Sequence, residues 1–204
     1  MTAGTAPRRL GVFGGAFDPP HIAHVALARA ALEQLNLDEL RIFPTGQAWH
    51  KAQALSPSED RLAMVRLAFG ELPRTAIDER ELQRPGPTYT VDTLRELKAQ
   101  EPGVQLFLIM GEDQAVSLPS WQEWETVVRL AAVCMAARPL PALQAGSAVP
   151  ALPAGAQLHL LRMPSMPESA TEVRQLTATG KGIAHLVPAG VARYIESNHL
   201  YQPA

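Results

Sequence analysis

Short apolar segments alternate with segments of helical composition along nearly the whole chain. The strand-like segments cover residues 9–13, 39–44, 75–79, 104–111, 131–139 and 157–163, and the helical segments cover residues 22–35, 56–69, 89–100, 120–130, 169–180 and 187–200. The segment VQLFLIMG, residues 104–111, is apolar without a break, which is typical of a central parallel strand buried on both faces. This alternation predicts an α/β fold in which helices cover both faces of a mostly parallel sheet.

The chain is expected to form one domain over residues 1–204, because it contains neither an internal repeat nor a shift in composition that would mark a boundary. We predict a doubly wound, Rossmann-like sheet, with residues 1–8 as a disordered lead-in and the Pro- and Ala-rich residues 139–155 as a loop. Such sheets bind ligands beyond the carboxyl ends of their strands, where the strand order reverses. The segment after the first strand is therefore a candidate site.

Composition excludes several classes of protein. The net charge of −2 gives no electrostatic footprint for a nucleic-acid partner, and no apolar run approaches the roughly 18 residues that span a bilayer. The first residues lack the apolar core of a signal peptide. The single cysteine, Cys134, lies in an apolar run and cannot form an internal disulfide, so we expect a buried thiol and a cytoplasmic location.

The sequence GGAFDPPHIAH, residues 14–24, joins the first strand to the first helix. Gly14 and Gly15 would let a ligand approach the backbone closely, and the helix start supplies unpaired N–H groups and a positive dipole end. His21 and His24 would face the same side of the first turn and donate to phosphate oxygens. Taken alone, the histidine pair would favour an ordinary helix with one capping and one packed histidine. The preceding glycines and strand favour an anion site.

Three other kinds of binding site are less favoured for this motif. The glycines are adjacent, so they do not form the G-x-G-x-x-G fingerprint of dinucleotide-binding proteins, which argues against a dehydrogenase. The Gly-Lys-Ser/Thr ending of a P-loop is absent. A zinc site would need a third ligand that the sequence does not show near the histidines.

A second helix start lies in SATEVR, residues 169–174. Ser169 or Thr171 could cap the helix, with Glu172 in the first turn and Arg174 projecting from it. Alone, this pattern would favour an ordinary cap beside a solvated arginine. Together with the first motif, it suggests that a polyphosphate is held between two helix beginnings.

These residues resemble the signatures of a known enzyme family. GGAFDPPHIAH and SATEVR are similar to the two signatures of the nucleotidyltransferase superfamily. The blocks FPTGQAWHK, DERELQRPGPTYTVDTL and LIMGEDQAVSLPSWQEWE, with the ending VARYIESNHLY, resemble bacterial nicotinate-nucleotide adenylyltransferases. The resemblance implies transfer of AMP from ATP to nicotinate mononucleotide, with pyrophosphate and deamido-NAD as products. It also implies direct in-line attack, with Mg²⁺ bound to ATP rather than held in a protein metal site.

The resemblance also implies a role for individual side chains. The residues expected to act on the reacting phosphates are His21, His24 and Arg174. Those expected to bind ATP are Gly14, Gly15, Gly111, Asp113, Ser169 and Thr171. Those expected to bind the nicotinate nucleotide are Thr45, His50, Lys51, Thr90 and Trp121. Residues 78–80 are expected to form an ion-paired strand end, and Trp124 is expected to pack in the core.

Three positions depart from the family pattern: Ala16, Ala23, and Leu140, which follows Arg138 and Pro139 where glycine is common. Ala16 stands where threonine is usual, which removes a hydroxyl, and Ala23 stands where glycine is usual, which adds a methyl group. Two alternative functions remain open. One is adenylyl transfer to another phosphomonoester, such as nicotinamide mononucleotide or phosphopantetheine. The other is a nucleotide-binding module without catalysis.

Overall fold

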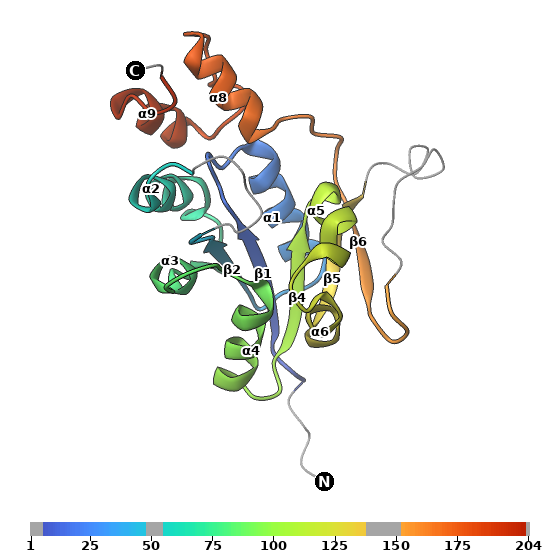
Figure 1. Ribbon diagram of the computed structural model, residues 1–204. Coiled ribbons are helices and arrows are strands. Elements are labelled where there is room, and N and C mark those ends of the chain that lie inside the picture. Colours follow the sequence, from blue (N-terminus) through green and yellow to red (C-terminus); the bar gives the residue numbers. More distant parts are fainter. Residues whose placement is uncertain (1–5, 48–54, 138–151, 203–204) are drawn as a thin grey trace.

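The computed structural model describes residues 6–47, 55–137 and 152–202 (Figure 1). Its strands are β1 (Arg9–Gly15), β2 (Glu39–Pro44), β3 (Thr75–Ile77), β4 (Gln105–Met110), β5 (Ala131–Ala137) and β6 (Leu158–Arg162). Its helices are α1 (Ile22–Gln34), α2 (Ser58–Phe69), α3 (Arg80–Gln83), α4 (Thr90–Gln100), α5 (Glu112–Ser117), α6 (Trp124–Leu130), α8 (Ala170–Ala178) and α9 (Ala189–Ser197), with a 3₁₀ turn over Leu118–Ser120.

The six described strands form one sheet in the order β3-β2-β1-β4-β5-β6, and every described pair is parallel. From β1 the chain winds outward through β2 to β3, and then returns to place β4 on the other side of β1. The strand order therefore reverses between β1 and β4. This arrangement confirms the expected doubly wound, Rossmann-like fold, and it puts the first motif at the reversal point.

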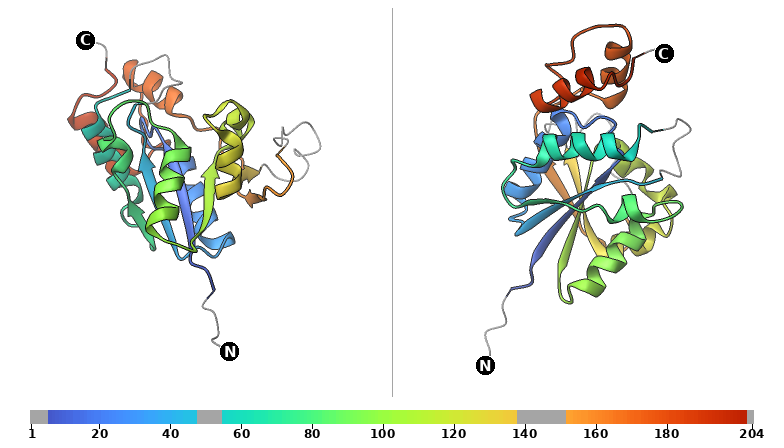
Figure 2. Two further views of the ribbon diagram at one scale, coloured as in Figure 1. Left: turned by 60° about the horizontal axis from the view of Figure 1, so that its bottom comes forward. Right: turned by 90° about the vertical axis from the view of Figure 1, so that its left-hand side faces the viewer.

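Helices cover both faces of the sheet (Figure 2). On one face, Leu27 and Leu32 of α1 and Phe69 of α2 pack against Phe13 and Phe107 of the sheet. On the other face, α4 and α6 pack against β4 and β5 through a separate apolar cluster. Cys134 is fully buried in β5, and burial raises the pKa of its thiol to about 12, as expected of an inert core residue.

A third apolar cluster attaches the C-terminal helices to α2. It is formed by Met64 of α2, Val173 of α8, and Val191 and Ile195 of α9, together with the segment between α8 and α9. The backbone N–H of Ile22, the first residue of α1, donates to the carbonyl of Leu186 in that segment, at 2.9 Å. The beginning of α8 thus lies close to the beginning of α1, although about 150 residues of chain separate them (Figure 1).

Local hydrogen bonds explain where helix boundaries differ from the prediction. The helix expected over residues 56–69 begins at Ser58, with Pro57 at the N-cap, and the Ser56 N–H donates to the Asp18 carboxylate at 3.0 Å. The helix expected over residues 120–130 begins only at Trp124, because Glu123 adopts a left-handed φ of 48°. The short helices α3 and α5 were not predicted.

Charged side chains stabilise both ends of the sheet. Arg80 forms an ion pair with Asp78 at 2.7 Å just after β3, which confirms the expected ion-paired strand end. Arg8, which was expected to belong to a disordered lead-in, forms ion pairs with Glu39 and Glu101 and is thereby fixed to the sheet. Among residues 6–47, 55–137 and 152–202, no helix has the length and apolar character needed to cross a bilayer.

Candidate active site

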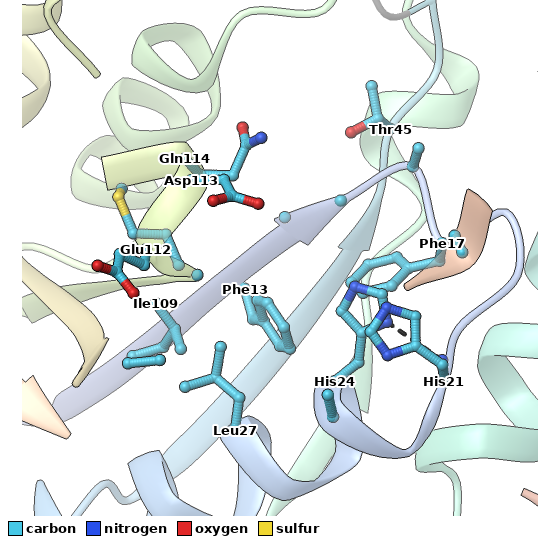
Figure 3. A pocket seen from close by; sticks show the side chains of 18 of the residues that line it. Phe13, Phe17, His21, His24, Leu27, Thr45, Ile109, Glu112, Asp113 and Gln114 are labelled. Carbon is cyan, nitrogen blue, oxygen red and sulfur yellow. Dashed lines mark hydrogen bonds between the residues drawn. The ribbon is translucent and has the colours of Figure 1, made fainter. Parts of the chain in front are cut away.

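A pocket of about 840 Å³ opens beyond the carboxyl ends of β1 and β4 (Figure 3). This volume is in the usual range for a small-molecule site. Eleven of the residues predicted for the site line it: Gly14, Gly15, His21, His24, Thr45, Thr90, Gly111, Asp113, Trp121, Ser169 and Thr171. The structure therefore brings both motif helices, and the segments after β2 and β4, to one cavity.

Two of the glycines leave room for a ligand. A Cβ atom built on Gly14 or on Gly111 would meet no protein atom within 4 Å, so both positions border open space in the pocket. Gly15 is different, because its Cβ would lie 3.0 Å from the ring of Phe17. Gly14 is the penultimate residue of β1 and Gly111 directly follows β4, so a ligand at the reversal point can approach both backbones.

The two histidines form the beginning of α1. His21 is the N-cap residue, and its backbone N–H donates to Nδ1 of His24 at 3.1 Å. The two rings stack with centroids 3.7 Å apart, and His24 also contacts the edge of the Phe17 ring. Because Nδ1 of His24 accepts a hydrogen bond, the neutral ring carries its proton on Nε2 and can act there as a donor.

Burial sets the charge of His21. The residue is 8% exposed, and desolvation lowers its pKa to about 4. At neutral pH His21 is therefore a neutral ring that can donate one N–H. A bound anion would reverse this preference, because a nearby negative charge favours the protonated form.

The beginning of α8 forms another wall of the pocket. Ser169 is its N-cap, and Ser169 Oγ accepts from the backbone N–H of Glu172 at 3.2 Å. Of the two expected caps, the structure thus selects Ser169, while Thr171 lines the pocket in the first turn. Arg174 lies just behind this wall, where its guanidinium donates to the backbone carbonyl of Asp18 at 2.8 Å. The second motif is thereby tied to the turn that precedes the histidines.

The remaining predicted residues lie on the other side of the cavity. Asp113 in α5 faces the histidines across the end of β1 (Figure 3). Thr90 is the first residue of α4, and Trp121 follows the 3₁₀ turn with its ring partly buried against the core. Trp124 packs against the same cluster, as expected. The predicted residues His50 and Lys51 lie outside the described part of the chain.

Several lining residues were not expected. Asp18, Thr88 and Glu81 border the pocket and are each more than 90% buried. Burial raises the pKa of Glu81 to about 7, although Thr93 Oγ1 donates to its carboxyl at 2.7 Å. The segment 163–168 completes the rim. Asp18, Thr88 and Glu81 lie inside the quoted motifs but were given no role there, whereas no pattern in the sequence marks residues 163–168.

The beginning of α4 contributes one residue more than expected, because Tyr89 lines the pocket beside the predicted Thr90. Its N-cap, Tyr89, makes no side-chain capping bond, and both Tyr89 and Thr90 line the pocket. The cavity is therefore bordered by the beginnings of three helices of nine or more residues, α1, α4 and α8. Each helix beginning carries a partial positive charge and unpaired N–H donors, which suits a ligand with several anionic groups.

The site does not contain a ready-made metal cage. Within the described residues, no three His, Cys, Asp or Glu side chains are grouped so that they could hold a metal ion. The Asp18 carboxylate is engaged by Ser56 and Tyr201. A divalent cation in this pocket would need most of its ligands from water or from the bound molecule.

Comparison with known proteins agrees with the sequence motifs. A profile of the cytidylyltransferase-like family matches residues 12–176. A protein of Albidiferax ferrireducens named "Probable nicotinate-nucleotide adenylyltransferase" is 52% identical over 207 residues, covering 97% of this chain and 100% of the relative. A relative of the same name from Bordetella avium is 42% identical, covering 97% and 100%.

A solved structure shares the fold. The Plasmodium falciparum nicotinic acid mononucleotide adenylyltransferase complexed with NaAD superposes with a TM-score of 0.74 at 20% identity. The alignment covers 95% of this chain and 97% of that chain. At this identity the similarity concerns the arrangement of helices and strands.

The buried His21 should make stability depend on pH. Between pH 6.5 and 4, His21 binds a proton in the unfolded chain but not in the folded chain. The unfolding free energy associated with neutral His21 is therefore complete above pH 6.5 and decreases as the pH falls toward 4. From pH 7 to pH 5, we expect the unfolding free energy of the unaltered protein to fall by about 2 kcal/mol more than that of His21→Asn.

Urea titrations at the two pH values measure this difference. Asparagine is a good N-cap that does not titrate, and the oppositely directed effect of Glu81 is present in both proteins and cancels. Equal pH dependence of the two proteins would show that His21 is not desolvated as the structure indicates.

Proposed function

We propose, because this chain belongs to the nicotinate-nucleotide adenylyltransferase family, that it transfers AMP from ATP to nicotinate mononucleotide, releasing pyrophosphate and forming deamido-NAD. The observation that carries the proposal is the single pocket at the strand-order reversal, onto which the beginnings of α1, α4 and α8 open. Such a site suits a reaction between two phosphate esters, because several negative charges must be held together within reach of one another.

The reaction requires positioning more than acid–base chemistry. The phosphate of the acceptor attacks the α-phosphorus of ATP in line, a P–O bond forms, and the bond to the β-phosphate oxygen breaks with its electron pair leaving on pyrophosphate. A phosphate monoester is already ionised near neutral pH, so no side chain has to remove a proton from it. The protein's task is to align the two phosphates and to stabilise negative charge on the leaving group.

The histidines and the beginning of α8 supply the donors for this task. His21 and Nε2 of His24 donate to phosphate oxygens of ATP from one side of the cavity, together with the backbone beside Gly14 and Gly15. Ser169, Thr171 and the unpaired N–H groups of α8 act from the other side. Arg174 is poised behind them, and exchanging the Asp18 carbonyl for a phosphate oxygen would bring its positive charge to the leaving group.

The adenosine and nicotinate halves then occupy the opposite walls. Gly111 gives the nucleoside close access to the backbone, and the Asp113 carboxylate accepts hydrogen bonds from ribose hydroxyls. Trp121 offers an indole face for stacking on the pyridine ring, and Thr90 with the N–H groups at the beginning of α4 receives the ring carboxylate. We assign Thr45, His50 and Lys51 to binding of the nicotinate nucleotide beside its phosphate.

The charge of Glu81 favours this assignment. Glu81 lines the pocket, and its raised pKa of about 7 leaves much of the carboxyl protonated at neutral pH. An anionic acceptor therefore meets less repulsion than it would from an ordinary glutamate. Among the described residues no group of carboxylates could cage a cation. Mg²⁺ tends to keep its waters and to bridge phosphates, so we assign it to the phosphates of ATP, where it would serve as a counter-ion.

Pyrophosphate release in the presence of ATP tests the proposal. The acceptors compared are nicotinate mononucleotide, nicotinamide mononucleotide and phosphopantetheine. We expect the highest kcat/KM with nicotinate mononucleotide, at least about tenfold above its amide, because losing one charged hydrogen bond costs about 1.5–3 kcal/mol. A preference for phosphopantetheine would refute the roles of Thr90 and Trp121. Release with none of the three would leave only a nucleotide-binding module.

Two glycine substitutions test where ATP lies. A methyl group on Gly14 or Gly111 meets no protein atom, so Gly14→Ala and Gly111→Ala should keep the unfolding free energy of the unaltered protein to within about 1 kcal/mol. The same methyl group would overlap the nucleotide, and we expect KM for ATP to rise about tenfold or more.

Gly11→Ala is the matched control in the same strand. Its Cβ would lie 2.6 Å from Leu37 Cδ1, and Gly11 does not line the pocket, so this substitution should lower stability while leaving KM for ATP unchanged. An unchanged KM in both Gly14→Ala and Gly111→Ala would place ATP elsewhere.

A further inference from the structure

A buried polar cluster lies below the turn that leads into the histidines. It consists of Asp18, Ser56, Arg61 and Tyr201, which we call the Asp18–Arg61 cluster. Arg61 of α2 is 2% exposed and Asp18 is 5% exposed. None of its members was a candidate from the sequence, and Arg61 does not line the pocket.

Arg61 holds three separate segments of backbone. Its Nη1 donates to the carbonyls of Ala16, at 3.1 Å, and Thr45, at 2.7 Å. Its Nε donates to the carbonyl of Ser56 at 3.0 Å, and its Nη2 lies 3.5 Å from that of Gly46. These carbonyls belong to the turn after β1, the end of β2 and the segment before α2. One rigid guanidinium fork therefore fixes their relative positions.

Asp18 supplies the opposite charge without touching Arg61. Its Oδ2 accepts from the backbone N–H of Ser56, whose carbonyl is bound by Arg61, so one peptide segment joins the two charged groups. Its Oδ1 accepts from the hydroxyl of Tyr201 at 2.7 Å, across 183 positions of sequence. None of the ion pairs between described residues includes Arg61. Burial lowers the pKa of its guanidinium, and the negative charge of Asp18 opposes that effect.

The cluster is connected directly to the site. Ala16, Asp18 and Thr45, each held by a hydrogen bond of the cluster, line the pocket. The backbone carbonyl of Asp18 also receives the guanidinium of Arg174. A displacement of this turn would therefore change the positions of the first motif, of Thr45 and of Arg174 together.

We propose that Arg61 is a positioning residue for adenylyl transfer, and that the Asp18–Arg61 cluster sets the alignment of the two phosphates by fixing the turn 16–18 against the end of β2. This inference rests on the proposed function. A buried guanidinium is not needed for stability alone, because a well-packed apolar side chain in its place often stabilises a protein equally well or better. An apolar side chain could not, however, form the hydrogen bonds by which Arg61 connects three separate backbone segments.

Kinetics of conservative variants test the proposal. Arg61→Lys keeps the charge but cannot span the same carbonyls, and Tyr201→Phe removes only the hydroxyl that donates to Asp18. We expect kcat to fall about 10- to 100-fold in Arg61→Lys and by a smaller factor in Tyr201→Phe, since misplacement by about 1 Å can cost 100-fold. The Kd for nicotinate mononucleotide, measured by calorimetry with its stoichiometry, should change less than about threefold.

Arg66→Lys is the matched control, because Arg66 lies on the same helix with 59% of its side chain exposed and pairs with Glu79. It should match the unaltered protein in kcat and Kd. Chemical rescue then separates positioning from a general folding defect. In Arg61→Ala, millimolar methylguanidinium should restore kcat, whereas urea, a neutral molecule of similar shape, should not.

Unaltered kcat in Arg61→Lys, or a binding stoichiometry that falls in step with kcat and no rescue by methylguanidinium, would overturn the proposal. All variants are compared on whichever acceptor the unaltered protein uses best. If the acceptor assignment is wrong, the unaltered protein will prefer an acceptor other than nicotinate mononucleotide. If the positioning role is wrong, Arg61→Lys will have the same kcat as the unaltered protein on the preferred acceptor.

Discussion

β1 forms parallel hydrogen bonds with β2 on one side and with β4 on the other, and the chain winds in opposite directions from it. Because each crossover from one parallel strand to the next is right-handed, reversing the winding sends the connecting helices to opposite faces of the sheet. The two connections therefore separate at the carboxyl ends of β1 and β4 and leave space between them. Everything described for the site depends on this space, since Gly14 and Gly111 border it and α1 begins beside it.

The C-terminal helices turn this crevice into a site with donors on several sides. Packing of Val173, Val191 and Ile195 against Met64 holds α8 and α9 on α2, and hydrogen bonds from Ile22 and Arg174 connect them to the turn before α1. The partial charges at the helix beginnings are fixed by the backbone, so they need little rearrangement when an anion binds. The low pKa of His21 follows from the burial of its ring, which disfavours the charged form, whereas a bound phosphate would favour it.

The sequence was sufficient for the parts of the structure that depend on local patterns. The unbroken apolar run of β4, the two glycines before His21 and the capping pattern at Ser169 each have a direct physical meaning, and they led to the correct fold and to one shared pocket. The bounds of β2 and the start of α1 also agree with the prediction.

What sequence analysis missed depends on long-range contacts to backbone atoms. Arg61 occupies a position in α2 that resembles any other arginine of an amphipathic helix, and its partners are carbonyls, which carry no side-chain signature. The backbone N–H of Ser56 donates to a carboxylate 38 positions earlier, a long-range contact that no local pattern marks. Tyr89 was not anticipated either, whereas its neighbour Thr90 was expected in the site, and the folded chain places both at the same cavity as His21 and Ser169.

A crystal structure of this chain with a non-hydrolysable ATP analogue measures most directly whether the helix beginnings act on one triphosphate. The account predicts phosphate oxygens within about 3 Å of donors from the α1 beginning, at His21 or His24, and of donors from the α8 beginning, at Ser169 or Thr171. A nucleotide whose phosphates contact only one of these two helices, or that lies outside the pocket, would contradict it.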